Sequence, residues 1–311
     1  MSPGHGLRAL AKSQWFAWNA SYGRILRFHR YHGSWPNLRQ PRTFNEKILY
    51  RSIYDRRELF HVLSDKLAVR DYVRERAGDA VAIPEVLFST RSPDELLTAP
   101  LPRCFVMKSN HGQGHTYMHG RVDVEVDRRR LAALAKKWLK YDNYERRGQW
   151  CYKGIEKTIF VEEHLSAGGP PPNDCKFFCF DGVPRLIEVG TDRFCGLRRA
   201  FYDPEWHRQE FDFADPPILY EVPRPPNLEQ MLDIAASLAR GLDFIRVDLY
   251  DLGDRVAFGE MTCLPQNGCG RFNPVSWDLE LGRHWHLTCA RGRASQRTEG
   301  RSDDPTAVIG A

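Results

Sequence analysis

The fold of this chain is decided by two segments, Phe244-Ile245-Arg246-Val247-Asp248-Leu249-Tyr250 and Phe258-Gly259-Glu260-Met261-Thr262. Both are apolar strand patterns, and the turn Leu252-Gly253-Asp254 between them predicts a β-hairpin. Alternate side chains of a strand share a face, so Arg246 and Asp248 project together. Glu260 joins them if the loop has three residues. An exposed hairpin with an ordinary salt bridge would show the same pattern.

The charged face of this hairpin suits phosphoryl chemistry. Mg²⁺ prefers oxygen ligands and is often held by one or two carboxylates together with nucleotide phosphates. Asp248 and Glu260 supply two such carboxylates. An arginine beside them, here Arg246, can stabilise the charge that develops on a transferred phosphoryl group.

The composition indicates a globular chain. It has 311 residues, 42% of them hydrophobic and 27% charged, which predicts one large or two modest domains with a packed core. No apolar run approaches the roughly 18 residues of a membrane span, and residues 1–10 lack a signal-peptide core. The eight cysteines show no zinc spacing, so we expect reduced thiols and a cytoplasmic protein. The net charge of +5 suits an anionic substrate and does not by itself indicate nucleic acid.

The mixture of elements predicts an α+β fold, because strands and helices do not alternate regularly. We expect helices from Phe44, over Ser64–Val73, after the cap Asp127, and over Leu228–Arg240 behind an Asn227/Gln230 capping box; strands over Ile83–Phe88, Phe105–Lys108 and Thr158–Leu165; and a hairpin around Asp181-Gly182. We see no internal repeat.

A second candidate site follows the strand that ends in Lys108. The loop after it contains Ser109, Gly112 and Gly114, and a lysine with such a loop can surround phosphate oxygens. The loop lacks the Gly-Lys-Ser/Thr sequence of a Walker A motif and the third glycine of a dinucleotide fingerprint. An ordinary surface turn would also fit.

Two further patterns are compatible with nucleotide binding. Glu162, Glu163 and Leu165 end an apolar strand just before a glycine-proline break, where they could contact an adenine edge and ribose hydroxyls. The alternative is a solvent-facing acidic strand end. Lys66 begins a predicted helix, where the helix dipole disfavours a cation unless an anion binds beside it.

Taken in order, these weak signals resemble an ATP-grasp protein, and the Arg-Val-Asp strand followed by Glu260 is similar to a segment of D-alanine–D-alanine ligases. The closer resemblance is to the TupA-like ATP-grasp family, named for a teichuronopeptide biosynthesis protein. It spans roughly residues 30 to 285. The motifs that carry it are residues 41–47, Asp65-Lys66, 106–112, 174–182, 201–206, 246–250 and 258–262.

The resemblance implies a role for each matching residue. Lys66 and Lys108, with Ser109, Gly112 and Gly114, would contact ATP phosphates; Glu162, Glu163 and Leu165 would line the adenine and ribose pocket; Lys176 would sit over the nucleotide or an acyl phosphate; Arg246 would stabilise the transition state; Asp248, Glu260 and Thr262 would hold Mg²⁺. ATP-grasp ligases usually have Asn where this chain has Thr262, a weaker ligand, which favours one Mg²⁺ over two.

The resemblance also implies a fold and an activity. The fold would be two α+β lobes clasping ATP (residues 101–290), after an aromatic and basic arm (1–40) and a shortened helical and αβ region (41–100), and before a disordered tail (291–311). The activity would be ADP-forming carboxylate–amine ligation. An amino acid would be joined to a uronic acid or an acidic polymer in surface polysaccharide biosynthesis. The arginines Arg193, Arg198 and Arg199 would bind the acceptor carboxylate, unless they are a plain surface cluster.

Other functions fit parts of the sequence. A sugar or lipid kinase would use the same nucleotide site without an amine, and a non-catalytic nucleotide-binding module would explain Thr262. The aromatic and basic arm could stack on RNA, although no nucleic-acid partner is expected, because that reading leaves the carboxylate hairpin unexplained. The arm could equally pack on the main domain, or touch an acidic membrane surface beside membrane-bound polysaccharide machinery.

Overall fold

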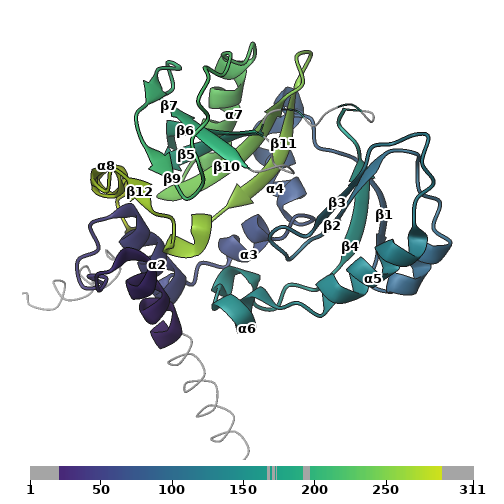
Figure 1. Ribbon diagram of the computed structural model, residues 1–311, viewed down its shortest axis with the longest axis horizontal. Helices are drawn as coiled ribbons and strands as arrows, with labels where there is room; N and C mark the ends of the chain where they lie inside the picture. The colour runs from purple at the N-terminus through teal and green to yellow at the C-terminus, as the bar shows by residue number, and fades with distance from the viewer. Residues whose placement is uncertain (1–20, 167–168, 170–171, 173, 192–196, 289–311) are drawn as a thin grey trace, which may run out of the picture.

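Two antiparallel sheets form the framework of the protein (Figure 1). The structure, a computed structural model, describes residues 21–166, 169, 172, 174–191 and 197–288. The four-stranded sheet has the order β1-β4-β2-β3, and the six-stranded sheet has the order β11-β10-β5-β6-β7-β8. The strands are β1 Val86–Thr90, β2 Phe105–Ser109, β3 Thr116–His119, β4 Ile159–Glu163, β5 Asp174–Phe180, β6 Val183–Thr191, β7 Arg198–Tyr202, β8 Arg208–Gln209, β10 Phe244–Asp251 and β11 Val256–Thr262; β9 Asp212–Phe213 and β12 Phe272–Asn273 form a separate pair.

Each sheet is covered by helices and has its own core. The helix α5 packs against the four-stranded sheet around Phe105, Leu131 and Val161, and α7 packs against β5, β6 and β10 (Figure 1). The helices are α2 Phe44–Tyr54, α3 Leu59–Ser64, α4 Val69–Ala77, α5 Arg128–Leu139, α6 Asn143–Arg147, α7 Leu228–Ala239 and α8 Ser276–His284, and residues 21–32 are also helical. These two lobes confirm the predicted α+β class.

Local capping chemistry explains the starts of α2, α5 and α6, whereas α3, α4, α7 and α8 start without a side-chain cap. Asp127 accepts a hydrogen bond from Arg130 N and begins α5, as expected. Thr43 and Glu46 form a complete capping box at α2. The predicted capping box at Asn227 is wrong, because the Asn227 side chain donates instead to Asp251 Oδ1 at 2.8 Å. Asn227 therefore ties the start of α7 to the end of β10.

The predicted helix over Ser64–Val73 is two helices. The α3 helix ends at Ser64, and Asp65 Oδ1 then accepts hydrogen bonds from Leu67 N and Ala68 N. These bonds hold a turn, and α4 begins only at Val69. Lys66 therefore lies in the turn between two helices and not at a helix start.

The register of the β10–β11 hairpin differs from the expected one. Its loop has four residues, 252–255, because Asp251 pairs with Val256. That register alone would put Asp248 opposite Gly259 and turn Glu260 to the other face. A β-bulge corrects it: Leu249 pairs with Phe258, but Asp248 pairs with Glu260. Arg246, Asp248 and Glu260 therefore do share one face, as expected, but because of the bulge and not because of a three-residue loop.

Two of the predicted segment boundaries can be compared with the structure. The strand β1 pairs with β4, so the four-stranded sheet extends across the expected boundary at residue 100. Half of the arm, residues 1–20, and the expected disordered tail lie outside the described residues. None of the helices in the described ranges is both long and apolar enough to span a membrane. Six cysteines within those ranges are free thiols.

Candidate active site

A cavity of about 680 Å³ lies between the two sheets. One wall comes from β2, β3, β4 and the segment after β4, and the other from β5, β6, β10 and β11. Eight of the predicted site residues line it: Lys66, Lys108, Gly114, Glu162, Glu163, Leu165, Asp248 and Glu260. Residues that are up to about 190 positions apart in the sequence therefore share one pocket.

Two lysines enter the cavity from the four-stranded side. Lys66 Nζ donates to Gly112 O at 2.6 Å, and Lys66 N donates to Asn110 O at 3.0 Å, so the glycine loop fixes Lys66. Burial lowers the pKa of the Lys66 ammonium, against the attraction of Glu260. Burial also opposes the charge of Lys108, but the carboxylate of Glu162 outweighs it, and the pKa of Lys108 is raised.

The carboxylate of Glu162 is a buried anchor between two cations. It forms ion pairs with Lys108 on one oxygen and with Arg70 on the other. Lys108 lies two places from Val106, which is the register partner of Glu162, so both side chains share the cavity face of neighbouring strands. Because each oxygen already has a cation, the predicted contact of Glu162 with adenine or ribose stays a prediction.

The glycine loop is packed on its own histidine. Ser109 Oγ lies 2.8 Å from His115 Nδ1, and a Cβ on Gly112 would stand 2.0 Å from that same nitrogen. Burial, assisted by His111, lowers the pKa of His115 to about 4, so the ring is neutral near pH 7. Gly114, at φ +70°, lines the cavity, whereas Ser109 and Gly112 are not among the lining residues. Any phosphate contact of those two residues stays a prediction.

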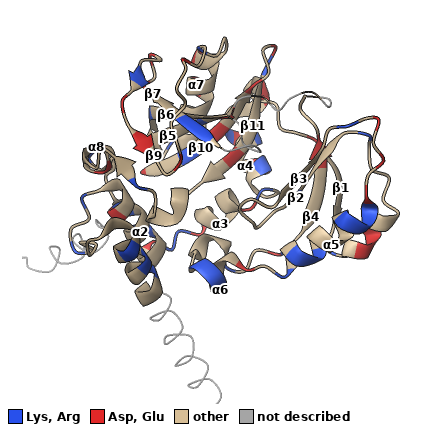
Figure 2. Cartoon of the chain, viewed as in Figure 1, with Lys and Arg blue, Asp and Glu red and all other residues tan. Residues whose placement is uncertain are grey.

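The opposite wall carries the hairpin charges. Arg246 Nε donates to Asp248 Oδ1 and Nη2 donates to Asp248 Oδ2, each at 2.7 Å. The same Nη2 lies 3.0 Å from Glu260 Oε1 and 3.0 Å from Thr262 Oγ1. Figure 2 marks acidic and basic positions along the ribbon of the six-stranded sheet. Arg246 thus holds both carboxylates in place from the same face of the sheet.

Burial affects these groups differently. The Asp248 side chain is 3% exposed, and that burial raises its pKa against the charges of Arg246 and Lys176. Glu260 is 39% exposed and faces the cavity. A cation close to these two carboxylates would favour their charged forms, because an opposite charge within about 4–6 Å stabilises an ionised group.

The remaining predicted residues lie along the six-stranded sheet. Lys176 is the register partner of Asp248 and forms an ion pair with Asp174. Arg199 is buried and holds Glu188 at 2.7 Å and Asp215 at 2.6 Å. Arg198 is exposed. Arg193 lies outside the described residues, so the predicted acceptor role of the three arginines stays a prediction.

Several lining residues were not predicted. Val106, Met118 and Tyr250 add apolar surface, and Thr116, Asp174 and Tyr220 add polar groups. Two of them follow from strand alternation: Tyr250 lies two residues after Asp248, and Val106 lies two before Lys108. Met118 pairs with Val106 across β2 and β3, a register that the sequence does not reveal.

The family of the chain can be stated from its sequence. The profile described as TupA-like ATPgrasp matches residues 46–286, which is most of the chain. The chain belongs to the TupA-like ATP-grasp family. The expectation drawn from the sequence motifs is thereby confirmed, and the two-lobed ATP-grasp fold agrees with it.

Solved structures of ATP-grasp enzymes are also similar. D-alanine–D-alanine ligase from Bacillus anthracis is 14% identical with a TM-score of 0.41, covering 76% of this chain and 70% of the ligase. N5-carboxyaminoimidazole synthase from Aspergillus clavatus is 10% identical with a TM-score of 0.40, covering 66% and 45%. The ATP-grasp ligase PsnB is 14% identical with a TM-score of 0.35, and the match spans 68% of this chain and 55% of PsnB. A comparison with curated proteins gives no match.

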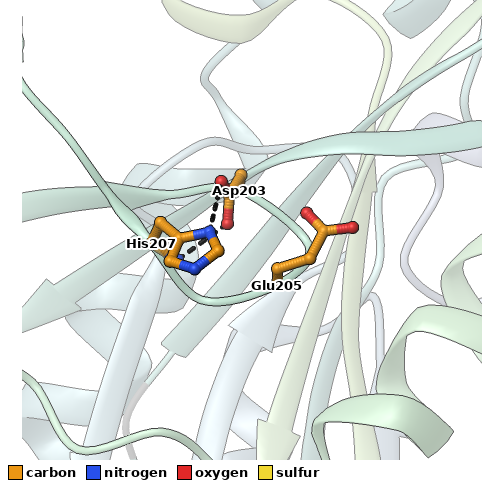
Figure 3. Close-up of side chains that lie close together, drawn as sticks. All are labelled: Asp203, Glu205 and His207. Carbon is orange, nitrogen blue, oxygen red and sulfur yellow. Dashed lines mark hydrogen bonds and ion pairs between the residues drawn. The ribbon is translucent and has the colours of Figure 1, made fainter.

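A second acidic cluster in this ATP-grasp chain has a structural explanation. Asp203, Glu205 and His207 offer ligand atoms within 4.8 Å of one another at the β7–β8 turn (Figure 3). The Asp203 carboxylate already accepts from His207 N at 2.7 Å and lies 3.1 Å from His207 Nδ1. Those bonds close the turn, and both Glu205 and His207 are exposed.

Proposed function

We propose that this protein is an ATP-dependent carboxylate–amine ligase that acts in the cytoplasm and forms an amide through an acyl phosphate. The carboxylate would belong to a uronic acid or an acidic polymer, and the amine to an amino acid. The product would be part of a surface polysaccharide. Family membership supports the general class of ATP-dependent ligase, and the finer steps are argued from the residues of the cavity.

One observation carries the proposal: Lys66 from the turn between α3 and α4, Lys108 from the four-stranded sheet and two carboxylates from the six-stranded sheet line a single cavity. Its volume of about 680 Å³ falls in the range of roughly 300–1,000 Å³ that small-molecule sites occupy. Lys66 and Lys108 offer positive charge to phosphates. Asp248 and Glu260 offer oxygen ligands for Mg²⁺, which suits a nucleotide triphosphate with its metal.

The donor set fits Mg²⁺. Asp248 and Glu260 are direct register partners, so their two carboxylates lie side by side, and an ionised carboxylate offers about four lone-pair sites to its partners. Bound Mg²⁺ would draw charge from the phosphates. Arg246 keeps both carboxylates aligned and sets a positive charge beside the reacting centre. Lys176, next to Asp248 in the sheet, adds a second cation there.

The chemistry needs no protein nucleophile. A carboxylate oxygen of the acceptor attacks the terminal phosphorus of ATP, and ADP leaves. The amine nitrogen then attacks the acyl carbon, phosphate leaves, and the amine loses a proton. The residues act by positioning both substrates and by neutralising charge. Arg193 and Arg198 are proposed to meet the acceptor carboxylate, whereas Arg199 is already engaged by Glu188 and Asp215.

The test is an assay with ATP, Mg²⁺, a panel of uronic acids and polyuronates, and a panel of amino acids. Release of ADP and phosphate that requires both a carboxylate and an amine, with an amide product by mass, is the expected result. A stable phosphorylated product formed without amine would assign the protein as a kinase. Tight ATP binding without turnover on any pair would assign it as a nucleotide-binding module.

Matched variants connect the activity to the hairpin. Asp248→Asn and Glu260→Gln should each lower turnover by about 100-fold or more, because each removes a metal ligand charge. Asp254→Asn changes an exposed carboxylate in the loop of the same hairpin and should leave turnover unchanged. Full turnover in either ligand variant would refute the metal assignment.

A further inference from the structure

The N-terminal segment, residues 21–45, carries a surface charge pattern that the ligase chemistry does not use. The first 45 residues of the sequence contain no Asp or Glu, while residues 21–45 contain five arginines. In the structure, the arginines Arg27, Arg30, Arg39 and Arg42 are exposed. We call these four side chains the basic surface. A charge excess of one sign on one exposed segment predicts an anionic partner.

The helix of this segment is two-sided. Arg24 and Phe28, four residues apart, are buried on one side. The other side exposes Arg27 and Arg30 between two tyrosines, Tyr22 and Tyr31, which are 50% and 48% exposed. Trp35, just after the helix, is 59% exposed.

The helix is held firmly to the protein, so this outer side has a fixed direction. Arg24 Nη1 donates to Ser52 O at 2.7 Å and to Gly148 O at 2.5 Å. Phe28 packs with Leu49 and Ile53 of α2. At the end of the helix, His32 Nε2 lies 2.9 Å from Gly268 O. Rigid presentation lowers the entropy lost when a surface docks on a partner.

The first acidic residue after this segment, Glu46, turns its carboxylate back onto the segment. Glu46 begins the acidic residues of the chain, and its carboxylate accepts from Asn37 N at 2.8 Å, Arg42 N at 2.8 Å and Thr43 N at 3.1 Å. Its charge is therefore directed to the backbone of the segment itself. Arg271, whose side chain donates to Tyr31 O, adds another cation next to the helix.

We propose that the basic surface docks this protein on an anionic phospholipid membrane. Arginines meet lipid phosphates electrostatically, while tyrosine and tryptophan side chains suit the boundary between headgroups and acyl chains. Single-stranded nucleic acid fits less well, because it needs open ring faces. Trp35 already has one face stacked on His29, at a ring distance of 4.2 Å and an angle of 5°.

The test is co-sedimentation of the full chain with vesicles of phosphatidylcholine alone and of an equal mixture with phosphatidylglycerol. Wild-type protein should bind the mixed vesicles, weaken at high salt and ignore the neutral ones. The triple variant Arg27→Gln/Arg30→Gln/Arg39→Gln should lose about tenfold or more in affinity, since each basic residue near the surface contributes measurably.

A matched control distinguishes the effect of the basic surface from the effect of the net charge of the protein. Arg129→Gln/Lys136→Gln/Lys137→Gln removes the same charge from exposed positions on α5, in the other lobe, and should bind as wild type. Thermal unfolding and ATP turnover without vesicles should be unchanged in both variants. No binding to mixed vesicles, or equal loss in the control, would overturn the proposal. Binding of polygalacturonate or single-stranded RNA in place of vesicles would overturn it too, and would leave the ligase proposal intact.

Discussion

Asp248 on β10 lies directly opposite Glu260 on β11, although the four-residue loop between the strands would by itself pair Asp248 with Gly259. The bulge at Gly259 shifts the register by one residue beyond Phe258. It brings Glu260 onto the cavity face and sets Thr262 opposite Arg246. One unpaired residue therefore aligns the whole charged face of the hairpin.

Gly259→Ala tests whether the β-bulge positions the two carboxylates. A Cβ at Gly259 would stand 2.9 Å from the Asp248 carbonyl oxygen and 3.1 Å from Tyr250 Cε2, so the bulge must open. We expect about 1–3 kcal/mol of lost stability, as for other overpacked sites, and at least a tenfold weaker affinity for Mg²⁺ with ADP. Calorimetric titration and urea unfolding measure the two effects.

The control for that variant is Gly253→Ala in the loop of the same hairpin. Gly253 has φ +85° with open space around it, so alanine there is strained but displaces nothing. It should lower stability and leave metal–nucleotide affinity unchanged. If Gly259→Ala bound Mg²⁺ with ADP as tightly as wild type, the bulge would not be what positions the carboxylates.

Thr262 is expected to orient its neighbours. Its hydroxyl lies 3.0 Å from Arg246 Nη2 and 3.2 Å from Glu260 Oε1. Thr262→Val keeps the shape but removes both bonds, and should lower turnover about tenfold, the size of one lost hydrogen bond to a charged group. The number of Mn²⁺ ions bound with ADP, counted by paramagnetic resonance, should not change. Loss of one ion in Thr262→Val would show instead that the hydroxyl is a metal ligand.

Much of the fold could be predicted from sequence because its signals are local. Short apolar runs indicate β2, β4, β5 and β10, and the Asp127 cap indicates the start of α5. The charged face of the hairpin was also visible, since Arg246 and Asp248 are two residues apart on one strand. The ordered series of motifs then indicated the family.

The rest depended on long-range geometry. The four-residue loop turns Glu260 to the wrong face, and the bulge at Gly259 turns it back. A regular hairpin with a three-residue loop would put Glu260 on the same face, so residue spacing alone does not distinguish the two arrangements. The ion pair of Glu162 with Arg70 joins residues 92 positions apart. Asn227 looked like a helix cap because its local sequence fits one, but Asp251 from a distant strand competes for its side chain.

Glu162→Gln tests the two ion pairs that Glu162 forms with Lys108 and Arg70. The change keeps the shape of the side chain but removes the charge that Lys108 and Arg70 share. Two buried cations are then left with weaker partners, so we expect about 3 kcal/mol or more of lost stability. The KM for ATP should rise more than kcat falls, because Lys108 loses its orientation. Glu85→Gln, which changes an exposed carboxylate just before β1 of the same sheet, is the control; an equal rise in KM there would mean that loss of negative charge alone, and not of the two ion pairs, raises it.

The final prediction concerns stability at low pH. Asp243 is buried and accepts from Arg51 Nη2 at 2.8 Å, Arg57 Nη2 at 2.7 Å and Trp285 Nε1 at 3.0 Å. Burial raises its pKa, but these partners outweigh burial and lower the pKa of Asp243 to about 2. Because the folded pKa lies below the unfolded value near 4, the stabilisation is full above about pH 4 and is lost as the pH falls towards 2.

Asp243→Asn should therefore remove a stabilisation of about 2 kcal/mol at pH 6, and the difference from wild type should shrink as the pH approaches 2. Urea unfolding at a series of pH values measures it. Asp254→Asn, which changes an exposed carboxylate paired with Arg255, should follow the wild-type curve. A difference between Asp243→Asn and wild type that stayed constant from pH 6 to pH 2 would mean that packing, and not the charge of Asp243, holds α2, α3 and α8 to the start of β10.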